Sequence, residues 1–135
     1  MLAGCSAGTV TVTLPTPAPP GAVLEQCARL VNYLPQALHG QKSRVVRPRS
    51  PLVHAWGDPP IVMRCGVPRP AGYDPASAQT ATVDGVSWFQ HIESTRVRWT
   101  AIRKTVNVEL VVPRSYESQG GFLVELGAAI RQTIP

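Results

Sequence analysis

Cysteine is the residue type with the most specific chemistry in this chain of 135 residues, which contains three of them. They are Cys5, Cys27 and Cys65. None belongs to a C-x-x-C pair, the spacing that thioredoxin-like redox centres and paired-cysteine zinc sites use. The spacing therefore favours lipidation and disulfide formation, and it predicts no metal site and no cofactor.

Cys5 closes the sequence Leu2-Ala3-Gly4-Cys5, which has the pattern of a lipobox. At a lipobox, bacterial signal peptidase cleaves just before a cysteine whose thiol has accepted diacylglycerol. A signal peptide also needs a basic stretch and an apolar run of roughly 7–15 residues before the cleavage site. Only Met1 to Gly4 precede Cys5, so we expect a translation start further upstream or a trimmed chain. The alternative is a free cysteine in a flexible tail.

Cys27 and Cys65 are the two cysteines that remain. An exported chain meets oxidising conditions, where two remaining thiols usually pair. Cys27 lies in the apolar stripe of a predicted helix, and Cys65 lies on the apolar face of a short predicted strand over residues 61–65. We therefore expect a Cys27–Cys65 disulfide that joins this helix to this strand. The alternative is two separately buried thiols.

Histidine and the acidic residues supply the only other side chains suited to acid–base catalysis. The chain has His39, His54 and His91, and its eight acidic residues form no obvious pair at general acid and base spacing. No H-E-x-x-H, G-x-S-x-G, P-loop or Rossmann pattern occurs. Gly57 and Pro59 prevent His54 and Asp58 from sharing a helical face. We expect no catalytic residues, although residues from separate strands can form an active site without any recognisable sequence motif.

The charge balance is basic, with a net charge of +5, and arginine makes up eleven of the thirteen basic residues. A basic excess suits anionic partners such as lipid head groups or wall polymers, and it also suits solubility alone. Nucleic acid is a poor fit, because alternation buries Trp99 beside the basic residues instead of offering it for stacking. No run of 18 apolar residues occurs, so no segment is expected to span a membrane.

These side chains must be positioned by a single domain. Residues 1–21 form the lipobox remnant and a small, polar, proline-rich stretch, which we expect to be a flexible tether that buries no core. Residues 22–135 form the domain. Pro20 and Gly21 start a helix that runs to about Leu34 and stops at Pro35. Residues 40–51 read as a basic loop that stays solvated or touches anionic lipid.

Period-two apolarity predicts a series of antiparallel strands after that loop. The expected strands cover residues 52–56, 61–65, 86–92, 97–102 and 106–112, and Asp84-Gly85 is a hairpin turn signal. A second helix is expected to begin at Gly120-Gly121. The predicted fold class is therefore α+β, a two-layer sandwich with both helices on one face of a mainly antiparallel sheet.

Two surfaces are candidates for partner binding. In the first, the proline corner after Trp56 presents Trp56, Asp58 and Arg69; the alternative is that Trp56 packs beneath the corner and Asp58 caps a turn. The second is the sheet face away from the helices, where alternation places Arg64 and Arg98 with His91 and Glu109. This face either holds an acidic polymer or protein or is simply solvated.

Three stretches resemble a known family. They are Trp56-Gly-Asp-Pro-Pro-Ile-Val-Met-Arg-Cys-Gly-Val-Pro-Arg-Pro70, Val83-Asp-Gly-Val-Ser-Trp-Phe89 and Val111-Val-Pro-Arg-Ser-Tyr116. They are similar to blocks of an actinobacterial exported family, domain of unknown function 3515, over about residues 22–135. The resemblance implies a secreted protein or lipoprotein of the cell envelope and implies no particular activity.

The sequence as a whole therefore predicts a non-enzymatic envelope lipoprotein. We expect a binding or accessory module exported to the outer face of the membrane and anchored there through Cys5. Its expected partners are the membrane itself and an anionic envelope polymer or an envelope protein. The alternative is a small hydrolase or transferase acting on cell-wall material.

Overall fold

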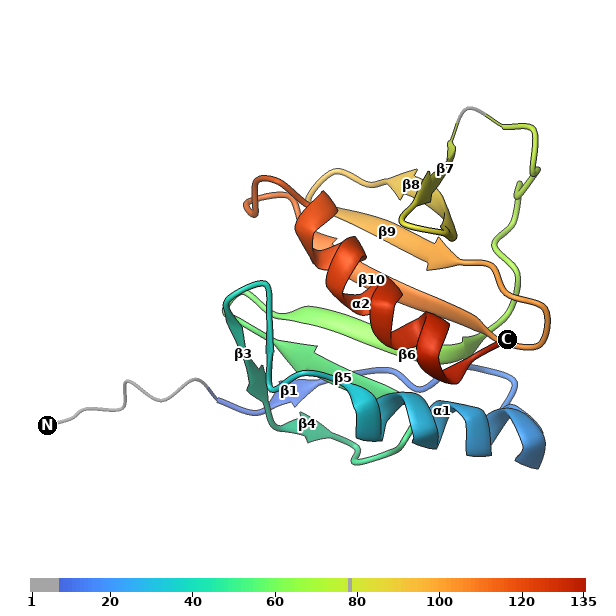
Figure 1. The fold of residues 1–135 in the computed structure, drawn as a ribbon. Coiled ribbons are helices and arrows are strands. Elements are labelled where there is room, and N and C mark those ends of the chain that lie inside the picture. Colours follow the sequence, from blue (N-terminus) through green and yellow to red (C-terminus); the bar gives the residue numbers. More distant parts are fainter. Residues whose placement is uncertain (1–7, 78) are drawn as a thin grey trace, which may run out of the picture.

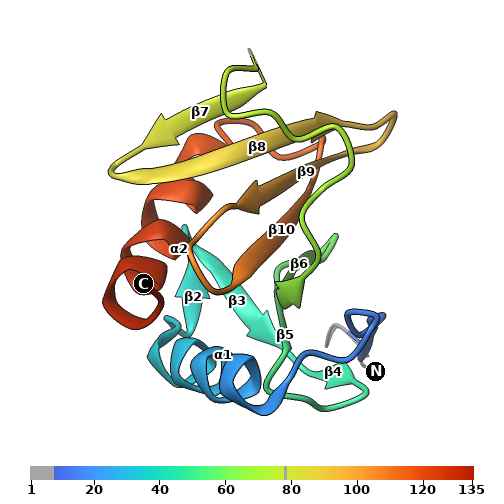
Figure 2. The same ribbon diagram turned by 90° about the vertical axis from the view of Figure 1, so that its right-hand side faces the viewer.

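The computed structural model describes residues 8–77 and 79–135, which form a helix-covered antiparallel sheet. Eight strands make this sheet in the order β2-β3-β5-β6-β10-β9-β8-β7, and each neighbouring pair is antiparallel. Both helices lie on the same face (Figures 1 and 2). The predicted α+β two-layer sandwich is confirmed.

The bounds of the elements are as follows. The helices are α1 (Gly21–Tyr33) and α2 (Gly120–Thr133). The strands are β1 (Val10–Thr11), β2 (Ala37–Leu38), β3 (Gln41–Arg44), β4 (Val46–Arg47), β5 (Val53–Trp56), β6 (Ile61–Val67), β7 (Thr80–Val83), β8 (Val86–Ile92), β9 (Arg96–Ala101) and β10 (Asn107–Pro113).

The helices begin and end where the sequence breaks the backbone pattern. Pro20 precedes α1 in an extended conformation, and Pro35 prevents the helix from continuing beyond Leu34. The face of α1 that buries Cys27 and Leu30 packs on β6 and on α2. None of the helices in the described ranges is both long and apolar enough to cross a membrane.

A disulfide fixes α1 to the centre of the sheet. Cys27 Sγ and Cys65 Sγ lie 2.12 Å apart, and both residues are fully buried. Cys65 shares the helix-facing side of β6 with Met63 and Ile61, which are also fully buried. The bond therefore joins the helix and the strand that the apolar spacing indicated.

The expected basic loop over residues 40–51 is wrong in part. Residues 41–44 form β3, in which Ser43 is the register partner of Trp56 in β5, and residues 46–47 form β4. The segment lacks the period-two apolarity of a half-buried strand because it lies near an edge of the sheet, where neither face needs a full apolar row. Pairing with β5 supplies the hydrogen bonds that hold it.

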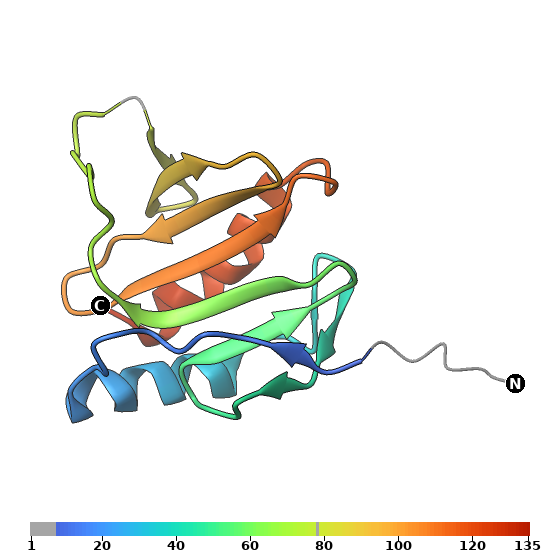
Figure 3. The ribbon, with the colours of Figure 1, turned by 180° about the vertical axis from the view of Figure 1, so that it is seen from behind.

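The expectation that the proline-rich stretch buries no core is wrong for its described part, residues 8–20. Val10 N–H donates to Val45 O at 2.8 Å and Val12 N–H donates to Arg47 O at 2.9 Å, which makes β1 a parallel partner of β4. Val10 and Val12 are buried in the main core cluster. Figure 3 shows this segment crossing the sheet on the side away from α2. Alternating valines between threonines allow the segment to act as a short strand, despite the prolines that follow.

Candidate functional site

The open face of the sheet is hollowed into a groove of about 640 Å³. The N-terminal segment contributes residues 11–13 to its lining, and Pro60 and Pro113 contribute from the ends of β6 and β10. Val62 and Val111 add apolar surface from those two strands. The groove exists because β1 covers only part of this face of the sheet. The N-terminal segment therefore forms one wall of the groove.

Charged residues cross the groove as a hydrogen-bonded network. Arg64 Nε and Nη2 donate to the two carboxylate oxygens of Glu109 at 2.7 and 3.2 Å. Arg98 Nη1 donates to Glu109 Oε2 at 2.9 Å, and its Nε and Nη2 donate to Glu93 Oε2 at 3.1 and 2.8 Å. Arg96 Nε donates to Glu93 Oε1 at 2.6 Å. Alternation correctly placed Arg64, Arg98 and Glu109 on this face, whereas Glu93 and Arg96 were missed.

Glu109 is the buried centre of this network, with 4% of the residue exposed. Burial opposes its ionisation, but the hydrogen bonds from Arg64 and Arg98 outweigh burial and hold the pKa of Glu109 below its ordinary value. Hydrogen bonds from Arg96 and Arg98 likewise lower the pKa of Glu93. Both carboxylates are thus ionised at neutral pH, and they neutralise most of the charge that the arginines would offer to an anion.

A second hollow of about 290 Å³ adjoins the groove across Arg98, which lines both. His91 and Phe89 line it from β8, and Pro70 lines it from the loop before β7. That loop packs on the sheet through Tyr73, whose ring meets Phe89 edge to face at 5.6 Å. The guanidinium of Arg69 lies 5.4 Å from the centre of the Tyr73 ring. Arg69 therefore belongs to the loop that frames this hollow.

The proline corner does not present Trp56. Its side chain is fully buried, and its indole N–H donates to Pro35 O at 3.3 Å, so the packed alternative describes it correctly. Asp58 is exposed, and its carboxylate lies 4.0 Å from Arg44 Nη1. The hydroxyl of Tyr116 donates to Pro59 O at 2.6 Å. Trp56, Asp58 and Arg69 therefore do not converge on one surface.

The histidines occupy three separate environments. Ser43 Oγ and His54 Nε2 lie 2.9 Å apart, and burial lowers the pKa of His54 below 6.5, so this imidazole is neutral at pH 7. Among the described residues no carboxylate forms an ion pair with His54, so the pair lacks the third group that orients a catalytic histidine. His39 Nδ1 lies 3.2 Å from Glu125 Oε2 at the surface. No histidine is therefore assembled with both an acid and a nucleophile in the described ranges.

Cys5, the predicted lipidation site, lies outside the described residues. Over residues 8–77 and 79–135, no three histidine, cysteine or acidic side chains gather as a metal ion would require. The groove is the larger of the two hollows on the open sheet face, and a binding surface is what its geometry can supply.

Comparison with known proteins gives one match, to a family. The model of a family described as "protein of unknown function (DUF3515)" matches residues 3–135. The match starts before residue 22, where the resemblance was expected to begin, and so it includes the N-terminal segment that lines the groove. Neither the curated proteins nor the solved structures contain a match. The match covers nearly the whole chain, and this protein therefore belongs to the family of domain of unknown function 3515.

Proposed function

We propose that this chain is a non-enzymatic binding module of the cell envelope, anchored by a lipid at Cys5 on the extracytoplasmic side of the membrane. The groove on the open sheet face is its binding surface, and this groove is the observation on which the proposal rests. The lipobox pattern and the buried Cys27–Cys65 disulfide support an oxidising, exported location.

The shape of the groove favours an extended segment of a partner protein. Successive residues of a strand direct their backbone groups to alternate edges. Because Val10 and Val12 donate to β4, the backbone groups of Thr11 and Thr13 point to the other edge. Thr13 O accepts a hydrogen bond from Arg64 Nη1 at 3.2 Å, which places that edge beside the groove. In the described part of the chain β1 pairs with β4 alone, and Thr13 O is taken by Arg64, so the backbone groups of Thr11 are the ones that remain for strand addition.

The charge of the groove also favours a protein segment over a strongly anionic polymer. Arg64, Arg96 and Arg98 face Glu93 and Glu109, so the five side chains carry a net charge of +1 (three positive, two negative). Their hydrogen-bond donors are already directed at carboxylates. A strongly anionic polymer would have to compete with these internal partners, whereas a peptide backbone can bind to the backbone groups of Thr11 without disturbing them.

Photo-crosslinking in cells tests this proposal. A benzophenone side chain replaces Thr11, which lines the groove, and in the matched control it replaces Val124, which is exposed on α2. We expect a discrete protein adduct from position 11 and none from position 124. Val111→Arg fills the groove and should abolish the adduct while leaving the disulfide-bonded fold intact.

Three results would contradict the proposal. They are the absence of an adduct at position 11, the same adduct from both positions, and an adduct that persists in Val111→Arg. A polydisperse adduct that is sensitive to glycan-cleaving enzymes would identify an envelope polymer in place of a protein segment.

A further inference from the structure

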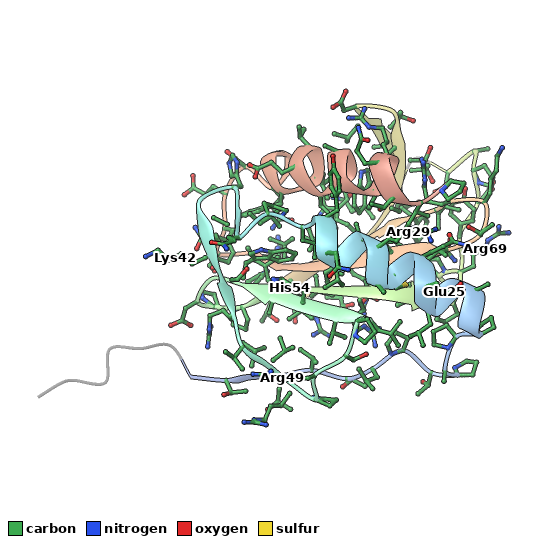
Figure 4. All side chains as sticks on the ribbon, turned by 60° about the horizontal axis from the view of Figure 1, so that its bottom comes forward. Glu25, Arg29, Lys42, Arg49, His54 and Arg69 are labelled. Atoms are coloured by element: carbon green, nitrogen blue, oxygen red, sulfur yellow. A yellow bond between two sulfur atoms is a disulfide. The ribbon has the colours of Figure 1, made fainter. Side chains whose placement is uncertain are left out.

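Exposed basic side chains gather beside the place where the N-terminal segment enters the domain. Lys42 on β3, Arg47 on β4 and Arg49 after it are all exposed, and Val45 between them is 54% exposed. We call these four residues the basic edge. In the described ranges none of its three charges forms an ion pair. Figure 4 shows Lys42 at the left end of the domain, Arg49 beside the N-terminal segment at the bottom, and Arg69 at the right end.

The part of the sequence that carries this edge contains almost no counter-charge. Between residues 8 and 57 the sequence has five basic residues and a single acid, Glu25. Asp58 follows, but its carboxylate approaches Arg44, which is turned inward. A solvated surface usually mixes both signs, so an unmixed basic edge indicates an anionic partner.

Arg44 also ties the start of the described chain to this edge. Its Nη2 donates to Gly8 O at 2.5 Å and its Nη1 donates to Gly57 O at 2.7 Å. Gly8 is therefore held against Arg44 at the end of β3. Three residue steps separate Gly8 from Cys5, and they reach at most about 11 Å when fully extended. This distance is comparable to the Debye length of about 8 Å at physiological ionic strength.

We propose that the basic edge is the surface with which the domain faces the membrane, and that its partner is the head groups of anionic phospholipids. This inference rests on the proposed lipid anchor, because an anchor at Cys5 leaves too little chain for the edge to leave the electrostatic field of the membrane. Each Lys or Arg close to an anionic surface raises membrane partitioning by up to about fivefold. Exposed Val45 adds apolar area at the same place.

Coupling the protein chemically to vesicles tests the orientation independently of lipidation in cells. With Cys27 and Cys65 in a disulfide, Cys5 is the thiol that reacts with a maleimide lipid. The full chain is coupled to vesicles of phosphatidylcholine alone or with about one third phosphatidylglycerol, and hydrogen exchange is followed by mass spectrometry. We expect amides of residues 41–49 to exchange about tenfold more slowly on the anionic vesicles, with the difference lost in 1 M salt.

The matched variants reverse two charges each. Lys42→Glu with Arg49→Glu should remove the protection, whereas Arg69→Glu with Lys104→Glu, at the other end of the domain, should keep it. Unchanged exchange patterns in solution show that both variants fold. Equal exchange on the two kinds of vesicle would overturn the inference, as would equal loss of protection in the two variants. Because the anchor is supplied chemically, an unlipidated Cys5 in cells would refute the proposed function without affecting this result.

Discussion

Glu109 is a carboxylate that the sheet can bury only because two arginines reach it. Its neighbours across the strands are Arg64 on β6 and, on the same face, Arg98 on β9. Removing a carboxylate from water is costly, and several charged hydrogen bonds are needed to offset that cost. The network thus stabilises an ionised group at the floor of the groove, and it makes the stability of the domain depend on pH.

Glu109→Gln should lower the free energy of unfolding at pH 7 by about 2 kcal/mol, because the arginines lose charged hydrogen bonds. The lowered pKa of Glu109 sets the pH dependence. Its ionised form stabilises the folded state fully above the unfolded pKa of about 4.3, and this contribution is lost as pH falls through the lower folded pKa. The gap between wild type and Glu109→Gln should therefore shrink below about pH 4 in urea titrations.

The exposed Glu117 provides the control, since Glu117→Gln should leave the unfolding curve unchanged at every pH. A gap for Glu109→Gln that is the same at pH 3 and pH 7 would mean that ionisation of Glu109 contributes nothing. A combined variant, Arg64→Met with Glu109→Leu and Arg98→Met, should recover most of the stability, because it leaves no buried charge without a partner.

At the scale of elements, β1 is what turns an open sheet face into a groove. It pairs with β4 over two residues and inserts Val10 and Val12 into the core cluster, while Thr11 faces outward. So short a parallel pair depends on side-chain burial more than on its hydrogen bonds. The segment should therefore detach without unfolding of the eight-stranded sheet.

Val12→Asp should release the N-terminal segment, because a carboxylate cannot remain in that apolar site without a partner. We expect proteolysis between residues 8 and 20 to accelerate at least about tenfold, while the disulfide-bonded remainder stays folded. Thr11→Asp, one residue away on the outward side, should leave the cleavage rate near that of wild type. Equal cleavage of the two variants would show that Val12 does not hold the segment.

The sequence predicted the elements whose apolar residues repeat regularly. Both helices and strands β5, β6, β8, β9 and β10 follow from periodicity and from the prolines and glycines that end them. It did not predict β3 and β4, whose residues are mostly polar and basic, because they are held by backbone pairing at the side of the sheet. Tertiary pairing of this kind leaves no periodic pattern in the sequence.

The residues of the candidate site were likewise predicted only in part. Alternation brought Arg64, Arg98 and Glu109 to one face, since register along each strand fixes the side to which a residue points. Glu93 and Arg96 flank the turn between β8 and β9, and their place in the network depends on turn geometry. The contribution of residues 11–13 was hidden by the prolines that follow them, which indicated a tether.

At the scale of the whole molecule, the two faces of the sheet have different roles. One face is covered by α1 and α2, and α1 is fixed there by the Cys27–Cys65 disulfide. The other face carries the groove, and β1 lies between the groove and the basic edge. An anchor at Cys5 would therefore hold the groove next to the membrane surface, where it can engage envelope proteins.

The exported, lipid-anchored state is tested most directly by the intact mass of the protein isolated from cells that express its native gene. We expect a mature chain that begins at Cys5, carries the added mass of a diacylglyceryl group, and gains two mass units only on reduction of the Cys27–Cys65 bond. A chain with no acyl mass on Cys5, or one whose Cys27 and Cys65 react with thiol reagents under denaturing conditions without prior reduction, would contradict the account.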